Sequence, residues 1–294
     1  MRTTVSLMTI VFLAGCHGGP AHHGGGHTAA PQPVPLTEAA IAVPIAPGKT
    51  AAWRAALEEL LGPRYAEYDA SRRRYGLTAQ TTFLQATPMG DFALIHLRGA
   101  DVRGSFHAMS SSQDPWDVEW RAMTLDLHGL DFADGTQATP EIEPAWSMTS
   151  DDLAGARPFM FLAPLGPDGV AGVRALAAEL MGPRHDAYVA ARRRLGVRRE
   201  VAFLESTARG DAVVFYWLAD DPQASLAALA SSPEPFDAWL RAAAGRAHPL
   251  PLATLATIAA GNTLIAQYPH APDGPSAARV VRCGSRRTRR PRRR

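Results

Sequence analysis

Cysteine and lysine are scarce in this chain of 294 residues, and the common catalytic motifs are missing. Cys16 and Cys283 are its two cysteines, too few for a framework of disulfide bonds. Lys49 is the single lysine, so Schiff-base chemistry has one candidate residue. The motifs CxxC, HExxH and GxSxG do not occur. We therefore expect no metal site of a familiar kind and no bound cofactor, and the sequence names no catalytic residue.

Positive charge is concentrated at one end of the chain. The formal net charge is +2, but nine arginines and no acidic residue lie in the last sixteen positions, Arg279–Arg294, so the other residues together carry −7. The pI of about 8.7 therefore describes a tail and not the globular part, and we expect no nucleic-acid binding. Residues 271–294 are predicted to be a disordered polycation, which either contacts anionic lipid or is an extension without function.

The N-terminus has the pattern of an export signal. One arginine precedes the apolar run Val5 to Leu13, which is too short to span a membrane as a helix, so residues 1–15 are predicted to be a signal peptide. The run ends in LAGC at Cys16, which resembles the lipobox of bacterial lipoproteins. The resemblance implies that Cys16 carries lipid such as palmitate and anchors the protein in the bacterial envelope, facing the periplasm or exterior. An ordinary secretory signal and an inner-membrane anchor are the alternatives.

Residues 16–37 combine glycine, proline, alanine and histidine without a hydrophobic period, which predicts a flexible tether. Imidazole is a common metal ligand, but a glycine-rich tether fixes no coordination geometry. We therefore expect a solvated linker and no specific metal site at its histidines, which are His17, His22, His23 and His27.

The remaining chain contains one pattern twice, at the offset of 120 residues that separates Gly62 from Gly182. The agreement runs without a gap over most of each copy, so the chain is a duplicated domain and not a solenoid. Other pairs with this offset are Pro44/Pro164, Tyr68/Tyr188, Gly76/Gly196, Asp101/Asp221, Pro115/Pro235 and Arg121/Arg241.

Each copy predicts the same order of elements. A short apolar strand is followed by two helices separated by Gly-Pro, then by a hairpin with a Gly-Asp turn, two more helices and a closing strand. This is the ferredoxin-like order βαββαβ. We expect an α+β protein made of two tandem modules, residues 38–150 and 156–270.

A triplet of arginines recurs in the second helix of each copy, in GPRYAEYDASRRRYG and GPRHDAYVAARRRLG. Residues three and four apart share a helix face, so Arg72 and Arg192 are predicted to lie along the aromatic face that includes Tyr68 or Tyr188. A structural role is the main interpretation and anion binding is the alternative. Asp117 and Asp237, which also recur, are predicted to mark helix starts.

The motif FLQATPMGD…D…SSQDPWD, repeated as FLESTARGD…D…SSPEPFD, resembles an uncharacterised bacterial domain family of the dimeric α/β-barrel superfamily. The resemblance covers both modules and implies that their sheets pair within one chain, as an intramolecular pseudo-dimer. Relatives in that superfamily include cofactor-free quinol monooxygenases, lactone isomerases and haem-dependent enzymes. Many family members carry a histidine before the motif proline, where this chain has Asp114 and Glu234, so no catalytic residue is transferred.

Strand alternation suggests where a ligand could bind, because residues two apart share a face. If the faces concerned line the barrel interior, a few polar groups converge in an apolar cavity, as in small-molecule sites. The candidate lining residues are Phe83, Gln85, His96, Phe203, Glu205 and Tyr216.

Three functions are compatible with this pattern. The first is an envelope lipoprotein that binds a small apolar or aromatic molecule in the barrel interior. The second is a cofactor-free monooxygenase- or isomerase-like enzyme that uses His96 and Glu205 in the same cavity. The third is a structural or protein-interaction module with a filled barrel. In each case we expect a monomer, with the membrane as partner through the N-terminal lipid.

Overall fold

A computed structural model describes residues 34–133 and 140–269. The predicted signal peptide, Cys16, the histidines of the predicted tether, Cys283 and the Arg-rich C-terminal segment lie outside the described residues. Within the described ranges, no helix is both long and apolar enough to cross a membrane. The described residues from Pro35 onward belong to one compact unit.

The two copies fold with the same order of elements, and the predicted α+β class is confirmed. Among the described residues, each crossover between strands contains the predicted pair of helices, and the last crossover, before β8, also contains a third helix (α9) that was not predicted. The first copy comprises β1 (Glu38–Pro44), α1 (Thr50–Leu61), α2 (Tyr65–Arg74), β2 (Leu77–Thr87), β3 (Gly90–Gly99), α3 (Val102–Ser111), α4 (Pro115–His128) and β4 (Glu141–Thr149). The second comprises β5 (Arg157–Pro164), α5 (Gly169–Met181), α6 (His185–Arg194), β6 (Val197–Thr207), β7 (Gly210–Ala219), α7 (Pro222–Ser231), α8 (Pro235–Ala247), α9 (Leu252–Ala259) and β8 (Thr263–Tyr268).

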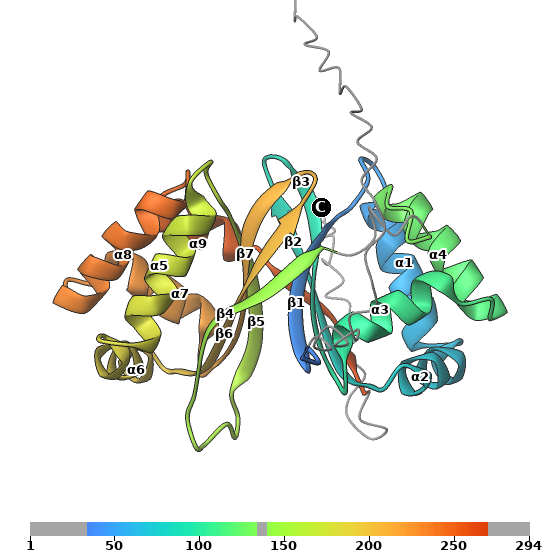
Figure 1. The fold of residues 1–294 in the computed structure, drawn as a ribbon, viewed down its shortest axis with the longest axis horizontal. Coiled ribbons are helices and arrows are strands. Elements are labelled where there is room, and N and C mark those ends of the chain that lie inside the picture. Colours follow the sequence, from blue (N-terminus) through green and yellow to red (C-terminus); the bar gives the residue numbers. More distant parts are fainter. Residues whose placement is uncertain (1–33, 134–139, 270–294) are drawn as a thin grey trace, which may run out of the picture. The chain divides into compact units, whose positions relative to one another are not determined.

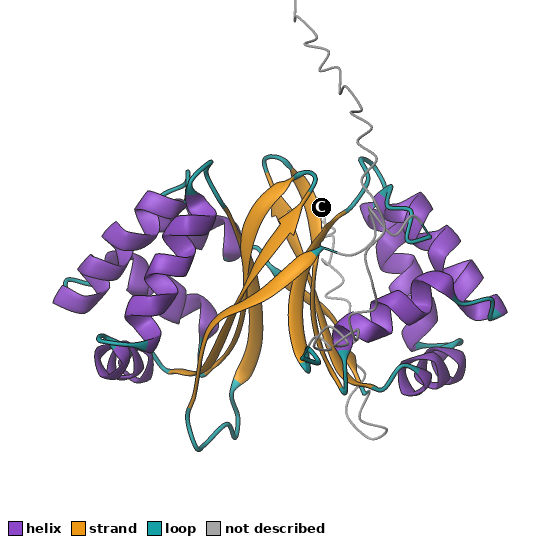
Figure 2. Cartoon of the chain, viewed as in Figure 1, coloured by secondary structure: helices purple, strands orange, loops and turns teal. Residues whose placement is uncertain are grey.

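Two antiparallel four-stranded sheets lie face to face, and helices cover their outer faces (Figures 1 and 2). The strand orders are β1-β3-β2-β8 and β4-β6-β7-β5. Both faces of each sheet are therefore covered, which is why β2, β3, β6 and β7 contain nearly continuous runs of buried residues. The arrangement confirms the predicted pairing of two modules into a pseudo-dimer.

The modules exchange their closing strands. β4 follows α4 in the chain but pairs with β6, so that Trp146 lies opposite Ala202. β8 pairs in the same way with β2, where Ala266 lies opposite Thr82. Each four-stranded sheet therefore contains three strands of one module and the last strand of the other. The ranges 38–150 and 156–270 describe the repeat along the sequence, but neither range holds a complete sheet.

Helices α2 and α6 end in the same way and place one arginine of each triplet inside the protein. Gly76 and Gly196 follow them with φ of 65° and 72°, a left-handed conformation that favours glycine. Arg72 and Arg192 are 5% and 3% exposed. Their guanidinium carbons lie 5.0 and 5.2 Å from the ring centres of the tyrosines four residues earlier, the cation–π contact that helical spacing predicts.

The recurring aspartates Asp117 and Asp237 lie in the first turn of α4 and α8, as the sequence predicts, but they do not cap these helices. Asp117 lies in the first turn of α4, whose N-cap is Asp114, and the carboxylate of Asp114 accepts a hydrogen bond from the Trp116 amide. Asp117 is buried and accepts hydrogen bonds from Tyr75 Oη and Ser112 Oγ. Asp237 is also buried, and it is paired with Arg194. Both aspartates therefore tie α4 or α8 to neighbouring elements.

Candidate functional site

The six predicted lining residues are all buried, and none of them lines either of the two cavities described below. Their side chains fill the interface instead. The rings of His96 and Tyr216 are stacked with centres 3.7 Å apart, and Phe83 packs edge-on against Phe159 at 6.1 Å. Phe203 is 1% exposed. This packing is what we expect of a structural or protein-interaction module with a filled barrel, the third function considered from the sequence.

Gln85 and Glu205 satisfy backbone groups of the opposite sheet. β1 and β5 are edge strands, so some of their amide groups have no partner within their own sheet. The Leu162 amide of β5 donates to Gln85 Oε1 at 2.9 Å, and the Ala42 amide of β1 donates to Glu205 Oε2 at 2.9 Å. A buried amide without an acceptor is costly, so these contacts explain why polar residues occur at both positions. Burial raises the pKa of Glu205 to about 8, despite its hydrogen bond from Ala42, so this carboxyl is protonated at neutral pH.

His96 is also engaged in the sheet interface. Its Nε2 lies 2.6 Å from Glu38 Oε1, and Arg199 donates to both oxygens of the same carboxylate at 2.7 and 2.6 Å. Burial lowers the pKa of His96 and outweighs the effect of Glu38. The acid–base pair of His96 and Glu205 considered from the sequence therefore consists of two residues that each hold a structural contact and contact no described cavity.

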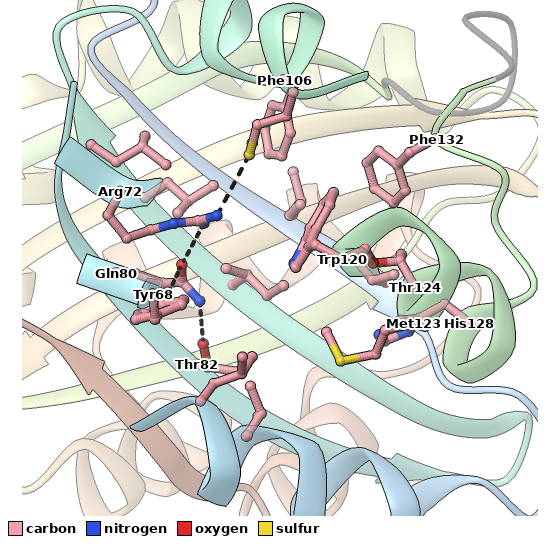
Figure 3. Close-up of a pocket in the computed structure, with 18 of the residues that line it drawn as sticks. Tyr68, Arg72, Gln80, Thr82, Phe106, Trp120, Met123, Thr124, His128 and Phe132 are labelled. Carbon is pink, nitrogen blue, oxygen red and sulfur yellow. Dashed lines mark hydrogen bonds between the residues drawn. The ribbon is translucent and has the colours of Figure 1, made fainter. Parts of the chain in front are cut away.

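A cavity of about 90 Å³ lies elsewhere, between the first sheet and helices α1 to α4 (Figure 3). We call it the first cleft. Most of its walls are apolar, including Trp53, Phe106, Trp120 and Phe132. Its polar side chains come from four elements. They are Tyr68 and Arg72 on α2, Gln80 and Thr82 on β2, Ser105 on α3, and Thr124 and His128 on α4.

Arg72 is the charged residue of the first cleft, and it is poorly partnered. Its terminal nitrogens lie 3.5 Å from Gln80 Oε1, Ser71 Oγ and Met109 Sδ, which are long contacts to uncharged atoms. Its Nε has no hydrogen-bond partner among the described residues, nor does any described carboxylate form an ion pair with it. Buried charges in proteins are normally paired, because removing an ion from water costs several kcal/mol. Arg72 is therefore unusual in being buried without an ion-pair partner among the described residues.

The equivalent arginine of the second module has an ion-pair partner, although its Nη1 has no hydrogen-bond partner among the described residues. Arg192 donates through Nε and a terminal nitrogen to the carboxylate of Glu200, which is 0% exposed. Trp146 Nε1 donates to the same carboxylate at 2.7 Å. Burial lowers the pKa of Arg192, but the effect of Glu200 outweighs that of burial and the pKa is raised, so Arg192 stays charged. Gln80 occupies the position in the first module that corresponds to Glu200.

Another cavity lies beside Arg192, between the second sheet and its helices. Its volume of about 50 Å³ is smaller than that of the first cleft. We call it the second cleft. Trp217 and Trp146 line it, whereas the equivalent positions in the first module are Leu97 and Ala266. The two indole rings therefore line the second cleft at positions where the first module has smaller side chains.

His128 is a residue of the first cleft that the sequence analysis missed. Its Nδ1 lies 2.8 Å from the Pro44 carbonyl oxygen, which can only accept, so Nδ1 carries the proton. Burial lowers the pKa of His128 despite this bond, so the ring is neutral and Nε2 is unprotonated. His248 makes the same contact with Pro164 at 2.9 Å. Their spacing of 120 residues was the available signal.

Comparisons with known proteins assign neither a family nor a function to this chain. The sequence matches no family model and no curated protein. Among solved structures, the chain is similar to an anthrone oxidase-like protein, with 14% identity, 78% of this chain and 92% of that chain covered, and a TM-score of 0.44. It is similar to a protein from Fusobacterium nucleatum subsp. nucleatum, named provisionally as a monooxygenase, with 9% identity, 78% and 92% coverage and a TM-score of 0.43. A third such protein, from Lactobacillus acidophilus, has 10% identity, 79% and 91% coverage and a TM-score of 0.32.

Proposed function

We propose that this chain is an envelope lipoprotein whose first module binds a small, mainly apolar molecule in the first cleft. The observation that carries the binding proposal is the difference between the clefts of two modules that share one fold. The second cleft is narrowed by two tryptophans and its arginine is neutralised, whereas the first cleft is open beside an arginine without an ion-pair partner among the described residues. A cavity with apolar walls and few polar groups is the usual form of a small-molecule site.

The size of the first cleft limits the ligand. An engineered apolar cavity of about 150 Å³ in another protein holds one benzene molecule, so about 90 Å³ suits a smaller group unless the walls move. Met109 and Met123 line the cleft. Methionine is unbranched and flexible, and rearrangement of these two side chains would enlarge the cavity without moving the backbone.

Native mass spectrometry of the full-length chain, purified from its own host, tests the binding proposal. We expect the wild type to carry a small-molecule adduct. The control variant Leu97→Trp places an indole where Trp217 lies in the second module and should lose the adduct while remaining folded. An adduct that persists unchanged in Leu97→Trp would place the ligand elsewhere.

The envelope location rests on the sequence pattern that ends at Cys16. We propose that lipid on this cysteine anchors the protein and that residues 16–37 connect the anchor to the folded part. The Arg-rich tail would then contact anionic lipid, at about 1 kcal/mol per arginine near the surface. Cys16→Ser should release the processed protein from the membrane fraction, and continued anchoring after signal cleavage would contradict lipidation.

His128 favours a second candidate function, a cofactor-free monooxygenase- or isomerase-like enzyme in the same cleft. A neutral imidazole with its Nδ1 proton fixed on Pro44 can accept a proton at Nε2, as general-base catalysis requires. The test is turnover of a panel of quinols and lactones. His128→Asn keeps a donor for the Pro44 carbonyl but removes Nε2, and should lower kcat about 100-fold or more. His248→Asn is the matched control, and equal activity of both variants would exclude this role.

A further inference from the structure

The two modules hold the same buried arginine in two different electrostatic states. Arg72 and Arg192 occupy equivalent positions on α2 and α6, and both guanidinium groups lie over the tyrosine four residues earlier. In the second module a carboxylate of the chain itself, that of Glu200, neutralises the guanidinium. In the first module the residue at that position is Gln80, which is uncharged.

Gln80 does not replace the missing carboxylate. Its Oε1 accepts a hydrogen bond from Tyr68 Oη at 2.9 Å and only a long one, 3.5 Å, from Arg72. Its Nε2 donates to Thr82 Oγ1 at 3.1 Å. The second module has Ala202 where the first has Thr82, so the partner that holds the Gln80 amide is specific to the first module. The amide is thus held by Tyr68 and Thr82, and the Nε of Arg72 stays without a partner in the described structure.

Among the described residues that line the first cleft, none carries a negative charge that would compensate Arg72. The titratable side chains that line the first cleft are Tyr68, Arg72 and His128, and none of these is an acid that ionises near neutral pH. A cation would therefore be repelled from this cleft, and an anion would be attracted.

We infer that the ligand of the first cleft is a monocarboxylate with an apolar body, whose carboxylate binds Arg72 where Glu200 binds Arg192. This inference rests on the proposed function and names its ligand class. The carboxylate would accept from Nε and a terminal nitrogen of Arg72, as Glu200 does from Arg192, and the apolar body would contact Trp120 and Phe106. In the second module, the carboxylate of Glu200 takes the place beside the arginine that the ligand carboxylate would take in the first.

Two substitutions that interconvert the modules test the inference. Gln80→Glu gives the first module the carboxylate of the second, and we expect it to fold, to raise thermal stability and to lose ligand binding. Glu200→Gln, in the second module, is the matched control that should leave ligand binding in the first cleft unchanged.

Isothermal titration of the full-length chain with propionate and propionamide, and with benzoate and benzamide, supplies the readout. In the wild type and in Glu200→Gln we expect the carboxylate of at least one pair to bind about tenfold or more tightly than its amide. Gln80→Glu should remove that preference. Equal binding of carboxylate and amide in the wild type, or a preference that survives Gln80→Glu, would overturn the carboxylate inference and leave the binding proposal intact. Binding of neither member of either pair, together with no adduct in native mass spectrometry, would overturn both.

Discussion

Two buried arginines at equivalent positions have different partners in this protein, and we expect them to contribute differently to its stability. Arg192 is part of an ion pair with Glu200, so its removal leaves a carboxylate buried without a partner. Arg72 has no such partner among the described residues, so its removal takes away an uncompensated charge. The difference depends on one residue of each strand, Gln80 in β2 and Glu200 in β6.

Substitution of each arginine by methionine should therefore separate the two roles. Arg192→Met is expected to lower the free energy of unfolding by about 3–5 kcal/mol, the usual cost of breaking a buried pair. Arg72→Met, measured without ligand, should leave the free energy of unfolding unchanged or raise it. Urea unfolding followed by circular dichroism measures both, and similar losses in the two variants would contradict this account.

Glu205 makes stability depend on pH. Its pKa is raised from 4.5 to about 8 by burial, so between these values the folded protein holds a proton that the unfolded chain has released. The folded state is therefore favoured at low pH, and this contribution is lost as the pH rises to about 8. Glu205→Gln keeps an acceptor for the Ala42 amide and cannot ionise. Its free energy of unfolding relative to the wild type should rise by up to about 1.4 kcal/mol per pH unit across this window. A difference that is constant from pH 5 to 8 would show that Glu205 does not titrate in this way.

At the scale of elements, the exchanged strands contribute to the difference between the two clefts. β4 comes from the first module and carries Trp146 into the second cleft, and β8 comes from the second module and brings Ala266 beside Thr82 of the first sheet. One of the two tryptophans that line the second cleft, Trp146, is therefore supplied by the other half of the chain, and the other, Trp217, lies on β7 of the second module.

Trp146→Ala should open the second cleft and destabilise the protein by about 3–5 kcal/mol, because a buried indole is lost together with its hydrogen bond to Glu200. The variant Ala266→Trp, at the equivalent position of β8, should fill the first cleft and abolish binding of its ligand. Chemical denaturation and the titrations described above measure the two effects. A stability of Trp146→Ala within about 1 kcal/mol of the wild type would contradict the packing role of this strand.

At the scale of the molecule, the exchange makes the two modules dependent on each other. A chain of residues 35–155 has β4 but lacks both β8 and the partner strand β6, so β2 would have an open edge. The offset of 120 residues that relates β2 to β6 also allows β4 of one copy to pair with β2 of a second copy.

We therefore expect residues 35–155, expressed alone, to form a homodimer with exchanged strands. Light scattering coupled to gel filtration measures its mass, and the 35–270 chain should be a monomer under the same conditions. A folded monomer of residues 35–155 would show that the exchange is dispensable.

Much of this fold could be predicted from local sequence patterns, but the candidate site could not. Helical spacing correctly placed Arg72 over Tyr68, and alternation correctly placed Gln85 and His96 on the face toward the other sheet. Alternation cannot show whether that face borders a cavity, because packing across the interface depends on residues far away in the chain. The strand exchange was missed because the closing strand pairs equally well, by its local pattern, with either module.

The duplication, the order of helices and strands, and the burial of one arginine per triplet follow from the sequence by itself, since each depends on residues within a few turns or strands of one another. The tertiary structure decided which strands pair, that the space between the sheets is filled, and that one arginine meets a carboxylate while its equivalent meets an open cavity. Those outcomes depend on contacts between residues that are far apart in the chain, such as the hydrogen bond from Trp146 in the first half to Glu200 in the second.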